Sequence, residues 1–344
     1  MIVLNKYKFA LIILVFFISC DDTTPPTISN KVVVQREKEM YLYGWNNEKY
    51  QIKLSWYDYY GCNSYDITIP EIEYQNTTNT QADHYHYIND IDYLPGSSLM
   101  AYVNCSDNQN VEYYDSILVT TKTIAPIENI IVNVIDDGYK DSLTFTHSSD
   151  SNINGWDFYH FKFNQNYESS HPHYFDITNS ESGWEKDEFP EGWWGNTGWG
   201  TNKLDYYNYS KENIDDSFCY VIKVTDDKNY SRNSHIKCSD NFTRNANNTV
   251  QIIATTNNLP RRIIVEWEQY TDPDFYQYIL WRSEYENMPE DSTQQLAILT
   301  NNNQTTYEDR YYVSDGKQWY YKIEVENQYG KSEFSDIQSG GTRP

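Results

Sequence analysis

The side chains best suited to ligand contact gather in one short stretch, FPEGWWGNTGWG, residues 189–200. Trp193, Trp194 and Trp199 lie there among four glycines, and Trp184 lies just upstream. Flat indole faces near Asp, Asn and Tyr suit sugar rings, and they serve equally well as anchors of a protein contact. In a third interpretation the indoles fold inward and form the loop's own small core. The residues alone leave a glycan platform, a protein contact and internal packing open.

One pattern resembles the start of a calcium loop. In DSNINGWD, residues 150–157, Asp150, Asn152 and Asn154 occupy the alternate positions that such a loop uses. The twelfth position should hold a bidentate glutamate, but here it is Phe161. We therefore expect a turn without calcium and predict neither a metal nor a cofactor.

The histidines and the catalytic motifs also favour binding over catalysis. His84-x-His86 and His171-Pro-His173 each offer two possible metal ligands, but no third ligand is evident for either pair. The sequence contains no HExxH, GxSxG, P-loop or GxGxxG motif. We predict that the protein is not an enzyme, and we rank a hydrolase without a recognisable motif as the third possibility.

The N-terminus predicts export. Lys6 and Lys8 precede an apolar run that is too short to span a bilayer and fits the hydrophobic region of a secretory signal. The run ends at FISC, which resembles a bacterial lipobox and implies cleavage after residue 19 with lipid on Cys20. The alternative is an ordinary signal peptide or an uncleaved anchor, with Cys20 incidental.

The acidic pair Asp21-Asp22 and the segment TTPPT then form a polar tether, residues 20–30. Acidic residues after a lipid cysteine mean inner-membrane retention in some bacteria and accompany surface export in others. The leaflet stays open, and we favour the outer membrane or cell surface of a bacterial envelope over the inner membrane.

The charge balance excludes one class of partner. The 344 residues include 26 Lys and Arg against 50 Asp and Glu, a formal net charge of −24. Such a chain is repelled by phosphate backbones, so we predict no nucleic-acid partner.

The elements that must position these residues are strands. Short alternating runs rich in Tyr, Thr, Ile and Val, such as KYQIKLSW, CYVIKVT and YYKIEVE, are separated by polar turns. No amphipathic helical run exceeds a turn or two. We predict an all-β fold of tandem immunoglobulin-like sandwiches.

The runs also repeat. Trp267 and Tyr278 flank a loop containing Asp272, and Phe145 and Trp156 stand at the same separations around Asp150. IKVTDDKNYSRNS (222–234) matches IEVENQYGKSEFS (323–335) without a gap, and a weaker copy begins at Trp56 and Tyr65.

These motifs resemble the fibronectin type III family, as found in bacterial surface proteins. The resemblance implies three domains, residues 31–123, 126–243 and 247–340, below called domains 1, 2 and 3. It is strongest in domain 3, where YILWR (278–282) and a motif from Gly316 to Ser332 carry it.

Four cysteines remain after Cys20, which in an exported chain indicates two disulfides with three possible pairings. The domain assignment favours Cys62–Cys105 and Cys219–Cys238.

The tryptophan stretch is an insertion relative to the repeat. Matched positions are 66 residues apart in domain 2 (156 to 222), against 38 in domain 1 (65 to 103) and 45 in domain 3 (278 to 323). Long insertions with many aromatic residues are usually functional. We expect a lipid-anchored envelope or surface protein that binds a polysaccharide or an envelope protein through domain 2. The alternative is a structural spacer or assembly module without a ligand of its own.

Overall fold

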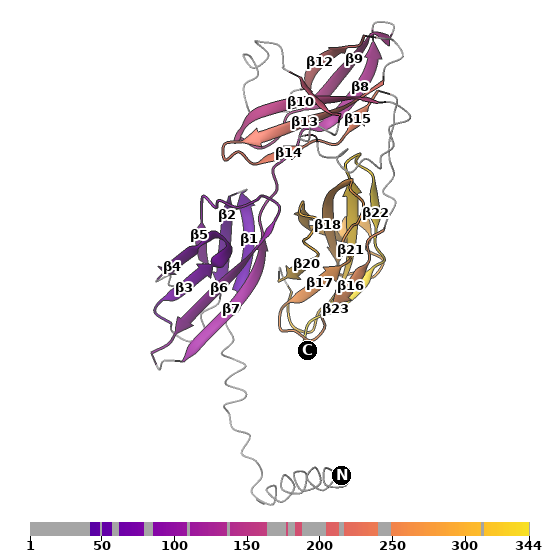
Figure 1. The fold of residues 1–344 in the computed structure, drawn as a ribbon. Coiled ribbons are helices and arrows are strands. Elements are labelled where there is room, and N and C mark those ends of the chain that lie inside the picture. The colour runs from indigo at the N-terminus through magenta and orange to yellow at the C-terminus, as the bar shows by residue number, and fades with distance from the viewer. Residues whose placement is uncertain are drawn as a thin grey trace, which may run out of the picture.

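The computed structural model describes residues 42–48, 50–56, 62–78, 85–108, 111–135, 138–163, 177, 183–187, 204–212, 217–239, 249–310 and 313–343. Across these ranges the chain forms strands and two short 3-10 turns, η1 (Pro70–Ile72) and η4 (Glu290–Ser292). No described helix has the length and apolar character needed to cross a membrane. The predicted all-β fold is confirmed (Figure 1).

Domain 1 contains a three-stranded sheet of order β1-β2-β5 and a four-stranded sheet of order β4-β3-β6-β7. The strands are β1 Leu42–Glu48, β2 Gln51–Trp56, β3 Tyr65–Ile69, β4 Tyr74–Thr78, β5 Tyr85–Ile88, β6 Ser98–Ser106 and β7 Glu112–Thr120. In β2 and β3 every second residue is buried, as expected for strands that cover a core with one face.

Domain 2 repeats this plan with the sheets β12-β9-β8 and β11-β10-β13-β14, and β15 also pairs with β13. The strands are β8 Glu128–Ile135, β9 Lys140–Thr146, β10 Ile153–Phe163, β11 Glu185–Asp187, β12 Leu204–Ser210, β13 Ser217–Asp226, β14 Ser231–Asn233 and β15 Lys237–Cys238. The tryptophan-rich stretch falls between β11 and β12.

Domain 3 has the sheets β16-β17-β20 and β19-β18-β21-β22, with β23 on β21. The strands are β16 Ile252–Thr255, β17 Ile263–Trp267, β18 Phe275–Ser283, β19 Thr293–Leu299, β20 Thr306–Asp309, β21 Gln318–Asn327, β22 Ser332–Phe334 and β23 Gln338–Gly341. In each domain the first, second and fifth strands form one sheet, and the fourth, third, sixth and seventh form the other. The fold is therefore a tandem of fibronectin type III-like sandwiches.

Residues of the internal repeat make equivalent hydrogen bonds in domains 2 and 3. Ile222 N–H donates to the Ser234 hydroxyl and Ile323 N–H donates to the Ser335 hydroxyl, each at 3.0 Å. Each serine N–H in turn donates to the carbonyl of the same isoleucine, at 2.8 Å in both domains. The gapless match between 222–234 and 323–335 thus reflects one shared hairpin geometry.

Each core is built on an aromatic pair from the repeat. The rings of Trp56 and Tyr65 are 5.0 Å apart, and those of Trp267 and Tyr278 are 5.7 Å apart. Phe145 meets Trp156 edge-on at 5.9 Å in domain 2. Edge-to-face and tilted contacts of this kind are favourable beyond their buried area.

Two buried ion pairs lie beside these cores, which sequence reasoning did not predict. Arg282 donates two hydrogen bonds to Asp309, at 3.0 and 2.9 Å, and stacks 4.1 Å above the Trp319 ring. In domain 2 the Lys211 Nζ lies 2.7 Å from Asp141 Oδ1. Arg282, Asp309 and Asp141 are at most 1% exposed, so these charges are stabilised by each other rather than by water.

Domain 2 is joined to domain 1 by the turn that follows β13. Asp226 is fully buried and accepts the Tyr50 hydroxyl of domain 1. Burial raises the pKa of Tyr50, and the hydrogen bond to Asp226 raises it further. Lys228 lies 4.6 Å above the Tyr50 ring, and the Tyr230 hydroxyl donates to Asp92 at 3.2 Å. The joint is therefore polar and closely fitted.

Domain 2 is joined to domain 3 through Arg232. Its guanidinium donates to the Ile124 carbonyl between domains 1 and 2 at 2.8 Å and to Gln277 of domain 3 at 2.6 Å. It also lies 5.1 Å from the centre of the Tyr276 ring, whose hydroxyl donates to the Asn233 carbonyl at 2.8 Å. One side chain thus contacts the first linker and domain 3 together.

A histidine–glutamate pair adds to the same joint. His235 Nε2 of domain 2 lies 3.2 Å from Glu326 Oε1 of domain 3. Burial raises the pKa of Glu326, but the hydrogen bond and charge of His235, with Gln277 and Arg232, outweigh burial and lower the pKa overall. The carboxylate form of Glu326 is therefore part of the joint.

The chain folds back on itself, so that domains 1 and 3 lie side by side below domain 2 (Figure 1). Tyr50, in the turn after β1, contacts domain 2, so Leu42 at the start of β1 lies at the opposite end of domain 1. In domain 3, Gln328 accepts the N–H of Ile236 of domain 2, whereas β23 pairs with the other end of β21. Both ends of the described chain therefore point away from domain 2.

Candidate binding surface

The fourth strand of domain 2, β11, directly precedes the tryptophan-rich stretch. β11 pairs antiparallel with β10, joining Phe158 to Asp187, Tyr159 to Lys186 and His160 to Glu185. This short strand has the place that β4 and β19 have in the other two domains. The insertion is thus attached to the sandwich at the strand that precedes the tryptophan-rich stretch.

Charged contacts hold β11 in register. His160 is 6% exposed, and its Nδ1 lies 2.9 Å from Asp187 Oδ2, while its Nε2 lies 3.5 Å from Glu185 Oε2. Lys186 Nζ pairs with Asp157 Oδ1 at 2.6 Å. The two carboxylates belong to the first and last residues of β11, so His160 holds both ends of this three-residue strand. The few backbone hydrogen bonds of so short a strand would not hold it alone.

Trp184 packs inside the protein. The residue is 7% exposed, and its ring centre lies 5.6 Å from that of Phe161 on β10. It belongs to a second hydrophobic cluster, on the outer face of the β10–β13 sheet, which also includes Tyr159, Ile177 and the Cys219–Cys238 pair. Trp184 therefore presents little surface to a ligand and acts as an anchor of the insertion.

The other three candidate ligand-binding tryptophans, Trp193, Trp194 and Trp199, lie outside the described residues. Of the interpretations given above, internal packing therefore holds for Trp184. For the other three, the glycan platform, the protein contact and packing remain predictions.

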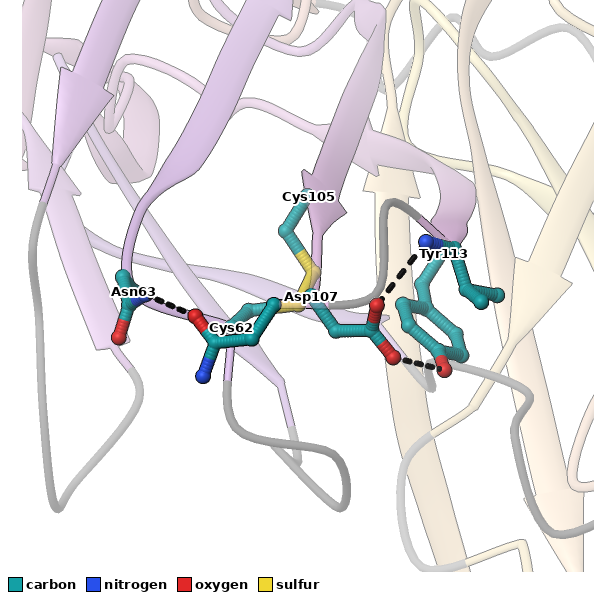
Figure 2. Close-up of a disulfide and its surroundings, with 7 residues drawn as sticks. Cys62, Asn63, Cys105, Asp107 and Tyr113 are labelled. Carbon is teal, nitrogen blue, oxygen red and sulfur yellow. Dashed lines mark hydrogen bonds between the residues drawn. A yellow bond between two sulfur atoms is a disulfide. The ribbon is translucent and has the colours of Figure 1, made fainter.

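Both predicted disulfides are formed. Cys62 and Cys105 have Cα atoms 6.0 Å apart and join the segment before β3 to the end of β6 (Figure 2). The turn after β6 is fixed beside them, because Asp107 accepts the Val111 N–H at 2.9 Å and the Tyr113 hydroxyl at 3.0 Å. This disulfide lies at the end of domain 1 that points away from domain 2.

The second disulfide joins Cys219 of β13 to Cys238 of β15, two residues directly opposite in the ladder, with Cα atoms 3.9 Å apart. It lies in the same cluster as Trp184 and Tyr329, a residue of domain 3. The disulfide, the insertion and the neighbouring domain thus share one small core.

The residues of the calcium-like pattern make protein contacts. Asp150 Oδ2 accepts the Ala125 N–H at 2.6 Å, so this carboxylate ties the turn to the linker between domains 1 and 2. Asn152 lies in that turn, where its carbonyl accepts the Asp227 N–H at 3.0 Å, and Asn154 lies exposed on β10. In the part of the chain that the structure describes, no group of three or more His, Cys, Asp or Glu side chains could hold a metal ion.

Of the paired histidines only His86 is described. Its Nε2 lies 2.7 Å from the Tyr74 hydroxyl across the two sheets, and burial lowers its pKa. His84, His171 and His173 lie outside the described residues, as does the predicted lipid-bearing Cys20.

Two tyrosines in the core of domain 3 also have raised pKa values. Burial raises the pKa of Tyr278 to about 12, although its backbone hydrogen bond with Tyr270 lowers it. The pKa of Tyr321 is raised further, by burial and by the charge of Asp309, to which the Tyr321 hydroxyl donates a hydrogen bond at 2.7 Å. These groups are enclosed in the core of domain 3, and their shifts reflect packing.

Comparison with known proteins identifies no close relative. No family model matches the sequence, and no curated protein does. Among solved structures, the chain is similar to the crystal structure of the chicken CNTN1 FN1–FN3 domains, at 10% sequence identity and a TM-score of 0.29. That alignment covers 89% of this chain and 98% of the other. The assignment of three fibronectin type III-like sandwiches rests on the strand order within each domain.

Proposed function

We propose that the protein is a lipid-anchored binding protein of a bacterial cell envelope, which engages a polysaccharide or a protein partner through the insertion of domain 2. The observation that carries this proposal is the attachment of the insertion. β11 and the buried Trp184 fix the residues directly before the Trp/Gly stretch to the sheet, so this stretch starts from a rigid base. Binding residues on loops held by a rigid scaffold are a common use of sandwich folds.

The acidic composition narrows the ligand. A chain with a net charge of −24 is repelled by anionic polymers, so a neutral glycan or a protein with a basic surface is the better fit. Tryptophan stacking on a sugar ring needs no charge on the ligand.

The test is affinity electrophoresis through gels that contain neutral and charged polysaccharides. We expect one polymer to retard the native protein and to leave a Trp193→Ala/Trp194→Ala variant unaffected. A Trp281→Ala variant is the matched control, since Trp281 lies on β18 of domain 3 and its Nε1 donates to Glu324 at 2.8 Å. Equal mobility of the native protein and the double variant with every polymer contradicts glycan binding through this pair.

The second candidate function is a structural spacer or assembly module without its own ligand. The joints around Tyr50 and Arg232 favour it, since a spacer needs fixed angles between domains. This alternative predicts that the indoles of Trp193 and Trp194 are buried. Quenching of tryptophan fluorescence by iodide or acrylamide separates the two functions, because only exposed indoles are quenched efficiently.

A further inference from the structure

Domain 3 touches domain 1 at an unpaired strand edge. β7 is the last strand of its sheet, so in the described chain no strand is hydrogen-bonded to its outer edge, although β1 of the other sheet lies close to β7. Arg310 Nη2 of domain 3 donates to the Ser116 carbonyl of β7 at 2.5 Å. The Leu118 N–H of β7 donates to Glu308 Oε2 at 3.3 Å. One guanidinium and one carboxylate thus satisfy a carbonyl and an N–H on the edge, as a neighbouring strand would.

An ion-pair network supports these two contacts. Arg310 Nη1 lies 2.5 Å from Asp115 Oδ2, and Arg310 Nη2 lies 2.7 Å from Glu308 Oε1. The side chains of Arg310, Glu308 and Asp115 are 5%, 10% and 16% exposed, so the network is largely shielded from water. Removing one partner of a shielded network leaves the other charges uncompensated, which is costly.

A second contact between the same two domains depends on a glycine. Thr300 N–H of domain 3 donates to the Gly96 carbonyl at 3.2 Å. Gly96 has a φ of +77°, and a Cβ there would clash with Thr300 Oγ1 and come within 2.8 Å of Thr123 Cγ2. Only glycine allows both this backbone conformation and this approach of the two domains.

We propose that the three domains form one closed body, in which domain 3 is locked onto domain 1 and the Glu308–Arg310 pair covers the open edge of β7. Exposed strand edges invite pairing with other chains, and charged side chains placed over an edge prevent it. The two ends of the described chain, residues 42 and 343, then move as one unit with domain 2. The lock concerns domains 1 and 3 only, so it does not depend on ligand binding by the insertion.

The test is hydrogen–deuterium exchange of the full-length chain in detergent micelles, read in the β7 segment that contains Leu118. We expect Arg310→Ala to make this segment exchange at least about tenfold faster, since opening exposes its outer amides. Arg261→Ala is the matched control, because Arg261 pairs with Asp315 within domain 3. Unchanged exchange in β3 and β6 shows that domain 1 remains folded.

Gly96→Ala tests the second contact, with Gly316→Ala as its control. Gly316 has a nearly identical φ of +75° but is exposed at the far end of domain 3, so its substitution adds the same backbone strain without a domain contact. We expect only Gly96→Ala to accelerate exchange in β7.

Two results overturn the proposal. One is equal exchange of the β7 segment in the native protein and in Arg310→Ala, which shows that Arg310 does not hold the edge closed. The other is a loss of native protection on tenfold dilution, which shows that the contact forms between two copies of the chain.

Discussion

Substitution of the buried Trp184 is the most direct test of whether this residue anchors the insertion or binds a ligand. Trp184 directly precedes β11, and its indole packs on Phe161 of β10. Trp184→Ala removes this contact. Trp184 lies in the outer cluster and not in the main core of domain 2, which is built around Phe145, Phe158 and Tyr220. We therefore expect the substitution to release the insertion while the sandwich stays folded.

The size of the effect follows from the buried area. A tryptophan side chain buries about 200 Å², which at about 25 cal/mol per Å² corresponds to about 5 kcal/mol. A compact unfolded state lowers this to about 3–4.5 kcal/mol, within the range of about 3–5 kcal/mol for Trp→Ala substitutions in cores. The backbone hydrogen bonds of a three-residue strand contribute about 3 kcal/mol at most, at about 1 kcal/mol each. The loss is therefore as large as the whole backbone contribution, which leaves only the charged contacts of His160 and Lys186 to hold β11.

Hydrogen exchange of residues 183–187 measures the detachment. We expect these amides to lose their protection in Trp184→Ala, while β13 keeps its protection, and Trp184→Phe should fall between the two. The reasoning is refuted if β11 stays protected in Trp184→Ala and a polysaccharide or protein no longer binds. That result would make Trp184 a ligand contact.

Three further predictions concern the membrane anchor, the joint between domains 2 and 3, and the core of domain 3. Cys20→Ser should move the protein from the membrane fraction to the soluble fraction and abolish incorporation of labelled palmitate; unchanged labelling would contradict the lipobox assignment. Because the pKa of Glu326 is lowered in the folded protein, its contribution to stability is complete above the ordinary value of about 4.5 and is lost as the pH falls through the lowered value. Acid titration should therefore expose the joint to proteolysis, and Glu326→Gln should remove that pH dependence; an identical acid response in the variant would show that another group is responsible. Arg282→Met should cost about 3–5 kcal/mol, because Asp309 stays buried without its guanidinium, and a second substitution, Asp309→Leu, should recover much of that loss in thermal unfolding. Equal melting temperatures of the single and double variants would contradict this account.

The sequence was sufficient to predict the sandwiches because their determinants are local and repeated. Alternating burial identifies β2 and β21 residue by residue, and the aromatic pairs Trp56–Tyr65 and Trp267–Tyr278 meet at the separations that the repeat required. The cysteine pairs followed from the domain assignment, which puts two cysteines in each of domains 1 and 2. For the strands and the aromatic pairs, a short segment contains the whole signal.

The joints could not be predicted, because they depend on residues distant in the chain. Tyr50 and Asp226 are 176 residues apart, and Arg310 and Ser116 are 194 apart, so no local pattern marks either contact. The inward position of Trp184 could not be predicted from the sequence either. Its burial depends on β10, β15 and a neighbouring domain, and the three residues of β11 are too few to show a periodicity.

The folded-back path of the chain has a practical consequence under the proposed attachment through Cys20. Leu42 and Gly341 lie at the same side, so a reporter fused after residue 344 would sit near the attachment surface, on the level of the Cys62–Cys105 disulfide. The described part of domain 2 would stand farther out by about one sandwich length, which is about 30 Å for strands of nine or ten residues. Antibodies against C-terminal epitopes would then reach intact cells poorly, whereas antibodies against β14 of domain 2 would bind farther from the attachment surface.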